Sequence, residues 1–147
     1  MDESSVESGG AVDLLLEASL ALEPDGSRIA QARHLAAAFL TTVADSGIAV
    51  AADTVQIVQL IVSELVTNAR KYAPGPALLH LRVTGPLLQV EIHDSNPAAP
   101  APKAPDPTRI GQHGLEIVAA LAHALTVEQT PVGKRITADV VLHPAAA

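Results

Sequence analysis

The chain has 147 residues, a formal net charge of −7, a hydrophobic content of 48% and an aromatic content of 1%. This length fits one domain with a core of Leu, Val, Ile and Ala. The absence of cysteine excludes a disulfide scaffold, cysteine catalysis and thiolate metal sites, and the acidic balance argues against a nucleic-acid partner. Because residues 1–10 lack a signal-peptide pattern and no apolar run has the length of a membrane span, we expect a cytoplasmic protein without membrane contact.

The first part of the chain predicts a tail, a strand and a helix. Residues 1–11 are polar and are expected to be a disordered tail, whereas residues 12–143 are expected to form the domain. The apolar run 12–22 predicts a strand of about nine residues, although its Leu and Ala residues would equally suit a helix. From Arg28 to about Val43, apolar residues recur at helical spacing and predict the first helix.

A longer amphipathic helix is predicted from about Asp53 to Tyr72. At about 100° per residue its apolar side chains fall on one arc and its polar side chains on the opposite arc. Glu64 and Asn68 are four residues apart and lie one turn above the other at the seam between the arcs. They are either edge residues hydrogen-bonded to each other or a carboxylate and a carboxamide aimed together at a ligand.

Two alternating runs, 79–83 and 88–94, predict an antiparallel hairpin with one buried face. The apolar residues of the second run point inward, and the period of two places Asp94 inward as well. His80 and His93 alternate with this face and are expected to point outward. A buried acid at the end of a strand requires a partner.

Residues 96–112 contain five prolines separated mostly by alanine, and this composition predicts a long, mobile loop. Gly111 and Gly114 end the loop, and a third helix is expected to begin at Leu115. A glycine at the start of a helix leaves backbone N–H groups free to face an anion. His113, Arg109 and Lys103 are either solvated loop residues or phosphate contacts.

Two further strands are predicted at about 125–129 and 135–142, with a turn at 131–133 between them. In the last strand, alternate residues point inward, namely Ile136, Ala138, Val140 and Leu142. The order β-α-α-β-β-α-β-β with short turns predicts an α+β fold, a two-layer sandwich with a mostly antiparallel sheet and helices on one face.

Three signals occur along the chain: an acid/amide pair on a helix, an inward acid at the end of a strand, and a mobile loop that leads into a helix with a glycine at its start. A purine nucleotide would use all three. An inward carboxylate accepts a hydrogen bond from an exocyclic amine, an Asn oxygen holds a magnesium ion, and helix N–H groups hold phosphates. Neither a Walker motif nor a GxGxxG motif is present, so a P-loop or Rossmann site is not expected.

These motifs resemble the GHKL ATPase/kinase superfamily with its Bergerat fold, and more narrowly the small actinobacterial anti-sigma-factor serine/threonine kinases. The resemblance covers about residues 27–142 and is strongest in 60–69, which is similar to the N-box of the family. It implies ATP and Mg²⁺ as cofactors, with Glu64 as the catalytic residue, Asn68 as the metal ligand and Asp94 as the reader of adenine. Residues 111–118 resemble the second glycine box, and 96–112 stand in the place of the ATP lid. The remaining implied nucleotide contacts are Asn96, Gly111, His113, Gly114 and Leu115.

The chain departs from the family pattern at three places around the expected nucleotide. Residues 94–97 lack the glycines of Asp-x-Gly-x-Gly, and Gln112 replaces the first glycine of Gly-x-Gly. Arg135 stands where the family often has a threonine early in the last strand, and Thr137 lies two residues further on.

The preferred interpretation is an ATP-binding regulatory protein that phosphorylates a protein antagonist and binds a sigma factor. The alternative is a catalytically inactive binding module with the same fold that regulates a partner by contact. The departures from the glycine boxes favour the module, whereas the Glu64/Asn68 pair favours the kinase. A sensor histidine kinase half is disfavoured because no helix with an acceptor His precedes the domain. The resemblance also allows a homodimer.

Overall fold

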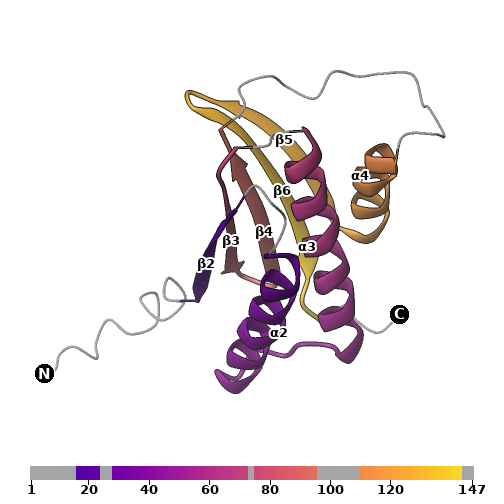
Figure 1. The fold of residues 1–147 in the computed structure, drawn as a ribbon. Helices are drawn as coiled ribbons and strands as arrows, with labels where there is room; N and C mark the ends of the chain where they lie inside the picture. Colours follow the sequence, from indigo (N-terminus) through magenta and orange to yellow (C-terminus); the bar gives the residue numbers. More distant parts are fainter. Residues whose placement is uncertain (1–15, 24–27, 73–74, 96–109, 144–147) are drawn as a thin grey trace, which may run out of the picture.

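The computed structural model describes residues 16–23, 28–72, 75–95 and 110–143. These ranges form five strands and three helices (Figure 1). In chain order the elements are β2 (Glu17–Leu22), α2 (Ile29–Asp45), α3 (Ala52–Tyr72), β3 (Ala77–Thr84), β4 (Leu87–Asp94), α4 (Ile110–Leu121), β5 (Ala124–Thr130) and β6 (Gly133–Val141).

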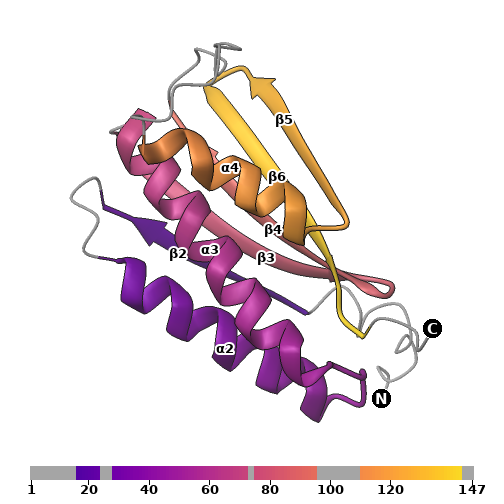
Figure 2. The same ribbon diagram turned by 90° about the vertical axis from the view of Figure 1, so that its right-hand side faces the viewer.

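The five strands form one sheet in the order β2-β3-β4-β6-β5, and every neighbouring pair is antiparallel. Figure 2 shows the three helices side by side over one face of this sheet, with α3 between α2 and α4. The predicted α+β sandwich, with a mostly antiparallel sheet and helices on one face, is therefore confirmed.

The core lies between the helices and the sheet, as the periodicities of the sequence require. The inward residues of β3, β4 and β6 are buried, and so is the apolar arc of α3, in which Ile61, Val62 and Leu65 have no exposed surface. Gly85 has a φ of 58° in the turn between β3 and β4, a conformation that glycine adopts without strain. This turn sets the register in which Leu79 lies opposite Ile92.

Two boundaries differ from the sequence-based expectation. The first strand comprises Glu17–Leu22, and the earlier part of the predicted strand lies outside the described residues. Helix α4 begins at Ile110, five residues before the predicted start at Leu115, so Gly111 and Gly114 lie inside the helix. Glycine lowers helix stability without forbidding a helix, and here tertiary packing overrides that preference. None of the helices in the described ranges is long and apolar enough to cross a membrane.

Candidate functional site

Glu64 lies where α3 packs against the start of α4. A Cβ atom at Gly114 would lie 2.8 Å from Glu64 Oε1, so the missing side chain of this glycine makes room for the carboxylate. Gly114 is buried and Glu64 is half-buried. Gly114, which the sequence placed at the junction of loop and helix, is thus a helical residue that allows a carboxylate to lie against α4.

Asn68 lies one turn further along α3 and is only 5% exposed. Among the described residues, no hydrogen bond joins its carboxamide to Glu64. The simpler of the two interpretations, a hydrogen bond between Glu64 and Asn68 at the edge of the helix, therefore does not describe the structure. The carboxamide offers one acceptor oxygen and one donor nitrogen at this position.

The beginning of α4 lies beside the C-terminal half of α3 (Figure 2). The first four N–H groups of a helix have no intrahelical acceptor and favour an anion. Because α4 begins at Ile110, these groups belong to residues 110–113 rather than to residues after Gly114. Glu64, Asn68 and this helix start form what we call the phosphate end of the site.

Asp94 points inward at the end of β4, as its phase predicts, and its partner is Lys134. The two residues lie directly opposite each other in the β4–β6 register, and Lys134 Nζ is 3.3 Å from Asp94 Oδ2. This contact is an ion pair without hydrogen-bond geometry, because Asp94 Oδ2 accepts no hydrogen bond within the described residues. The side chain of Asp94 is 1% exposed and that of Lys134 is 2% exposed. Each charge is therefore buried against the other. We call this pair the base end of the site.

The backbone around this pair is tightly packed. A Cβ atom at Gly133 would lie 1.8 Å from the carbonyl oxygen of Asp94, so no other residue fits there without moving a strand. The close approach keeps the beginning of β6 against the end of β4, and Lys134 is the next residue along β6.

Arg135 and Thr137 belong to the opposite face of the sheet. Arg135 forms an ion pair with Glu128 of β5, on the face that carries no helix. The β6 residue that faces Asp94 is thus Lys134, which the sequence-based reasoning missed. The signal was present, because the period of two that places Ile136 inward also places Lys134 inward.

The remaining expected contacts are only partly within the described residues. Asn96, Lys103 and Arg109, together with most of the expected lid, lie outside them. Gly111 and His113 are residues of the first turn of α4. Leu115 is half-buried and packs against the hydrophobic core.

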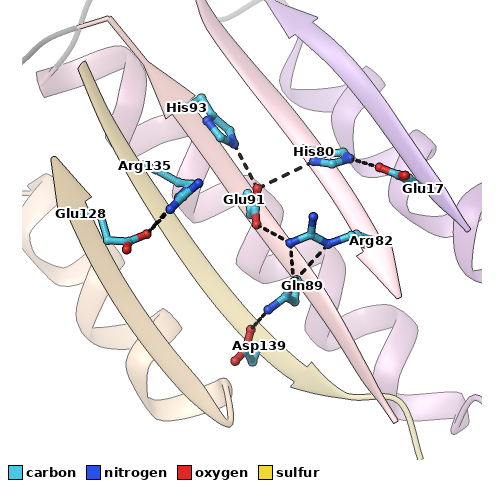
Figure 3. Close-up of polar contacts among 9 residues, drawn as sticks. All are labelled: Glu17, His80, Arg82, Gln89, Glu91, His93, Glu128, Arg135 and Asp139. Atoms are coloured by element: carbon cyan, nitrogen blue, oxygen red, sulfur yellow. Dashed lines mark hydrogen bonds and ion pairs between the residues drawn. The ribbon is translucent and has the colours of Figure 1, made fainter. Parts of the chain in front are cut away.

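A second polar cluster covers the face of the sheet opposite the helices (Figure 3). At its centre Glu91 is only 6% exposed, forms an ion pair with Arg82 at 3.2 Å and is hydrogen-bonded to His93 at 3.0 Å. His80 Nδ1 lies 3.7 Å from Glu91, and His80 Nε2 lies 2.8 Å from Glu17 Oε1. The outward orientation predicted for both histidines is consistent with this cluster. Because it is on the other side of the sheet, it cannot contribute to the site around Glu64.

The pKa of Glu91 reflects two opposing effects. Burial is the largest single effect and raises the pKa, but the hydrogen bond with His93 and the positive charges of Arg82, His93 and His80 together outweigh it. The net result is a pKa below the ordinary carboxyl value. Glu91 is therefore held as a carboxylate by its neighbours.

One pocket lies apart from the site. A pocket of about 340 Å³ beside Asp53 and Leu121, at the other end of the α3–α4 pair, contains none of the site residues. Within the described part of the chain, no three His, Asp or Glu side chains are arranged to hold a metal ion.

A family model described as a histidine kinase-like ATPase domain matches residues 23–140, and the chain belongs to this family, a GHKL type of ATP-binding domain. A solved structure, the histidine kinase domain of the blue-light-activated histidine kinase from Erythrobacter litoralis EL346, is 22% identical with a TM-score of 0.48. The match covers 73% of this chain and 61% of that chain, so this chain spans less than two thirds of its length. A search of curated proteins found no match.

Domains of this family bind ATP, usually with Mg²⁺, and the two ends of the site fit this ligand differently. At the phosphate end, a buried carboxamide, a carboxylate that lies against α4 and a helix start suit a magnesium–phosphate group. At the base end, the carboxylate expected to accept from adenine is already paired with a buried lysine. The phosphate end fits the ligand, whereas the base end does not fit it in the expected way.

Proposed function

We propose that the protein is an ATP-dependent regulator of the anti-sigma-factor type, which phosphorylates a serine or threonine of a protein antagonist and binds a sigma factor in the cytoplasm. The family supports ATP as the ligand. The finer role rests on the resemblance of residues 60–69 to the N-box of such kinases and on the place of Glu64 in the structure.

The observation that carries the proposal is the position of Glu64 against Gly114. The carboxylate projects from α3 to the start of α4, where it has room because Gly114 has no side chain. Bound Mg·ATP would supply the transferable phosphoryl group and the charge that stabilises it. Asn68 would hold the magnesium ion, and the N–H groups of residues 110–113 would hold phosphate oxygens. Glu64 would orient the hydroxyl of the substrate and accept its proton.

The alternative is a binding module that transfers no phosphate and regulates its partner by contact. One observation favours it: the Asp94–Lys134 ion pair engages the carboxylate expected to bind adenine. Glu64 distinguishes the two proposals, because a module has no use for a base beside the phosphates.

The test is a comparison of Glu64→Ala with wild type, with Glu116→Ala as the matched control. Glu116 is an exposed glutamate on α4, so its replacement removes the same charge from a helix surface. If Glu64 acts on the substrate hydroxyl, its loss should lower phosphotransfer by roughly 10²–10⁴-fold and change ATP affinity only a few-fold. Asn68→Ala should instead weaken Mg·ATP binding itself.

The assay is radiolabel transfer from ATP to candidate antagonist proteins, beside calorimetric ATP binding on the same samples. If Glu64→Ala labels a substrate as fast as wild type does, the proposed role of Glu64 is wrong. If wild type binds ATP but labels no protein from a panel of antagonists, the binding module is the better description.

A further inference from the structure

The register between β4 and β6 places Lys134 beside Asp94. Asp94 and Lys134 are paired residues of two adjacent strands, and a Cβ atom at Gly133 would lie 1.8 Å from the Asp94 carbonyl oxygen, so the two strands approach closely beside the pair. The described residues offer Lys134 no other ion pair. A ligand that reaches Asp94 therefore meets a carboxylate whose partner cannot move to another carboxylate.

A purine base competes poorly with such a partner. The exocyclic amine of adenine is a neutral donor, whereas Lys134 brings a full positive charge to 3.3 Å from Asp94 Oδ2. A base that displaced Lys134 would also leave a buried ammonium, 2% exposed, without its counterion. Both effects oppose the replacement of Lys134 by adenine.

We infer that Lys134 is a specificity-determining residue that prevents Asp94 from selecting adenine, so that the site recognises a magnesium–polyphosphate group with little regard to the base. This inference rests on the nucleotide binding in the proposed function and does not depend on phosphotransfer. The affinity then comes from the phosphate end, at Asn68 and the start of α4, and nucleoside triphosphates with different bases bind alike.

The first experiment uses the wild-type chain and measures the affinities for ATP and GTP by calorimetry with Mg²⁺. Adenine carries a donor where guanine carries an acceptor, so a carboxylate that reads this position favours ATP strongly. We expect the two affinities of wild type to agree within about threefold. A wild-type preference for ATP of about tenfold or more would overturn the inference and leave the proposed kinase function intact.

The second experiment uses Lys134→Thr, with Arg135→Thr as the matched control. A threonine at 134 suits a strand, and its shorter side chain leaves Asp94 able to accept from a base. Arg135→Thr removes a positive charge from the next residue of β6, but on the face away from Asp94. Lys134→Thr should prefer ATP to GTP by roughly tenfold or more, whereas Arg135→Thr should behave like wild type.

Thermal unfolding of each variant shows whether it is folded. If Lys134→Thr is not folded, the ratio of the wild-type affinities for ATP and GTP decides the inference. A folded Lys134→Thr protein that binds ATP and GTP equally would overturn the role of Lys134. Absence of binding of either nucleotide to wild type and to Lys134→Thr would overturn the inference together with ATP binding. Loss of phosphotransfer alone would count only against the proposed kinase function.

Discussion

Asp94 and Lys134 depend on each other for their burial. Each side chain is at most 2% exposed, so removal of one charge leaves the other in a dry place without a counterion. Breaking a buried pair from one side costs roughly 3–5 kcal/mol, whereas replacing both partners often costs little. We therefore expect Asp94→Asn to lower the free energy of unfolding by roughly 3–5 kcal/mol.

The measurement is a double-mutant cycle by urea unfolding with Asp94→Asn, Lys134→Met and the double variant. The double variant should be more stable than the sum of the single changes predicts, because it leaves no uncompensated charge. Additive changes would show that the two charges do not stabilise each other.

At the scale of single residues, the period of two predicted that Asp94 is buried at the end of β4, and its side chain is buried. Asn68 was predicted at the seam between the two arcs of α3, and it is buried as well. Lys134 was overlooked because its partner depends on the register between β4 and β6, and α4 and β5 lie between these strands in the chain. Cross-strand partners of this kind are not visible in local patterns.

At the scale of elements, the helix pair α3–α4 and the strand pair β4–β6 each contain a glycine at their closest contact. At Gly114 a new Cβ would meet only the end of the flexible Glu64 side chain, at 2.8 Å, whereas at Gly133 it would meet a backbone carbonyl at 1.8 Å. Alanine is also the better helix former by about 1 kcal/mol. Gly114→Ala should therefore keep or slightly raise stability, while Gly133→Ala should cost roughly 1–3 kcal/mol or more.

The two variants are compared by thermal unfolding and by phosphotransfer. Gly114→Ala should remain folded but lose much of its activity, because Glu64 must leave its position. Full activity with unchanged stability would show that the position of Glu64 against α4 does not matter for the reaction.

The start of α4 shows why element boundaries are harder to predict than element types. Glycines at 111 and 114 and the preceding prolines are loop signals when the sequence is considered alone. In the structure these glycines belong to the first turns of α4, where the absence of a side chain at Gly114 gives room to Glu64. A tertiary contact thus explains a residue that local propensity assigned to a loop. The strands β3, β4, β5 and β6, in contrast, lie within two residues of their predicted bounds, because the alternation of apolar and polar residues extends through them.

At the scale of the whole molecule, the sheet separates two polar regions. The helices and the candidate site occupy one face, and the cluster around Glu91 occupies the other (Figure 3). The class of the fold followed from the order of elements, but the strand order did not, since β6 lies between β4 and β5 in space. The same order places Glu91 in a central strand, where residues of both neighbouring strands surround it.

This position makes Glu91 a contributor to the pH dependence of global stability. Its pKa in the folded protein is below the ordinary carboxyl value of 4.5 because, although burial raises the pKa, the hydrogen bond with His93 and the nearby positive charges lower it further. The folded state therefore holds this proton less tightly than the unfolded state. The contribution to stability is complete above pH 4.5 and is lost as the pH falls through the lower pKa of the folded protein.

Glu91→Gln keeps the size of the side chain and removes the titration, so it isolates this contribution. At pH values near 6 the variant should be less stable than wild type by roughly 1–2 kcal/mol, since Arg82 and His93 lose a charged partner. The difference should shrink as the pH is lowered to about 3. Glu128→Gln is the matched control on the same face, because the exposed pair of Glu128 with Arg135 should contribute little. Urea unfolding at several pH values measures both, and a Glu91→Gln deficit that stays constant down to low pH would mean that packing, rather than charge, explains the burial of Glu91.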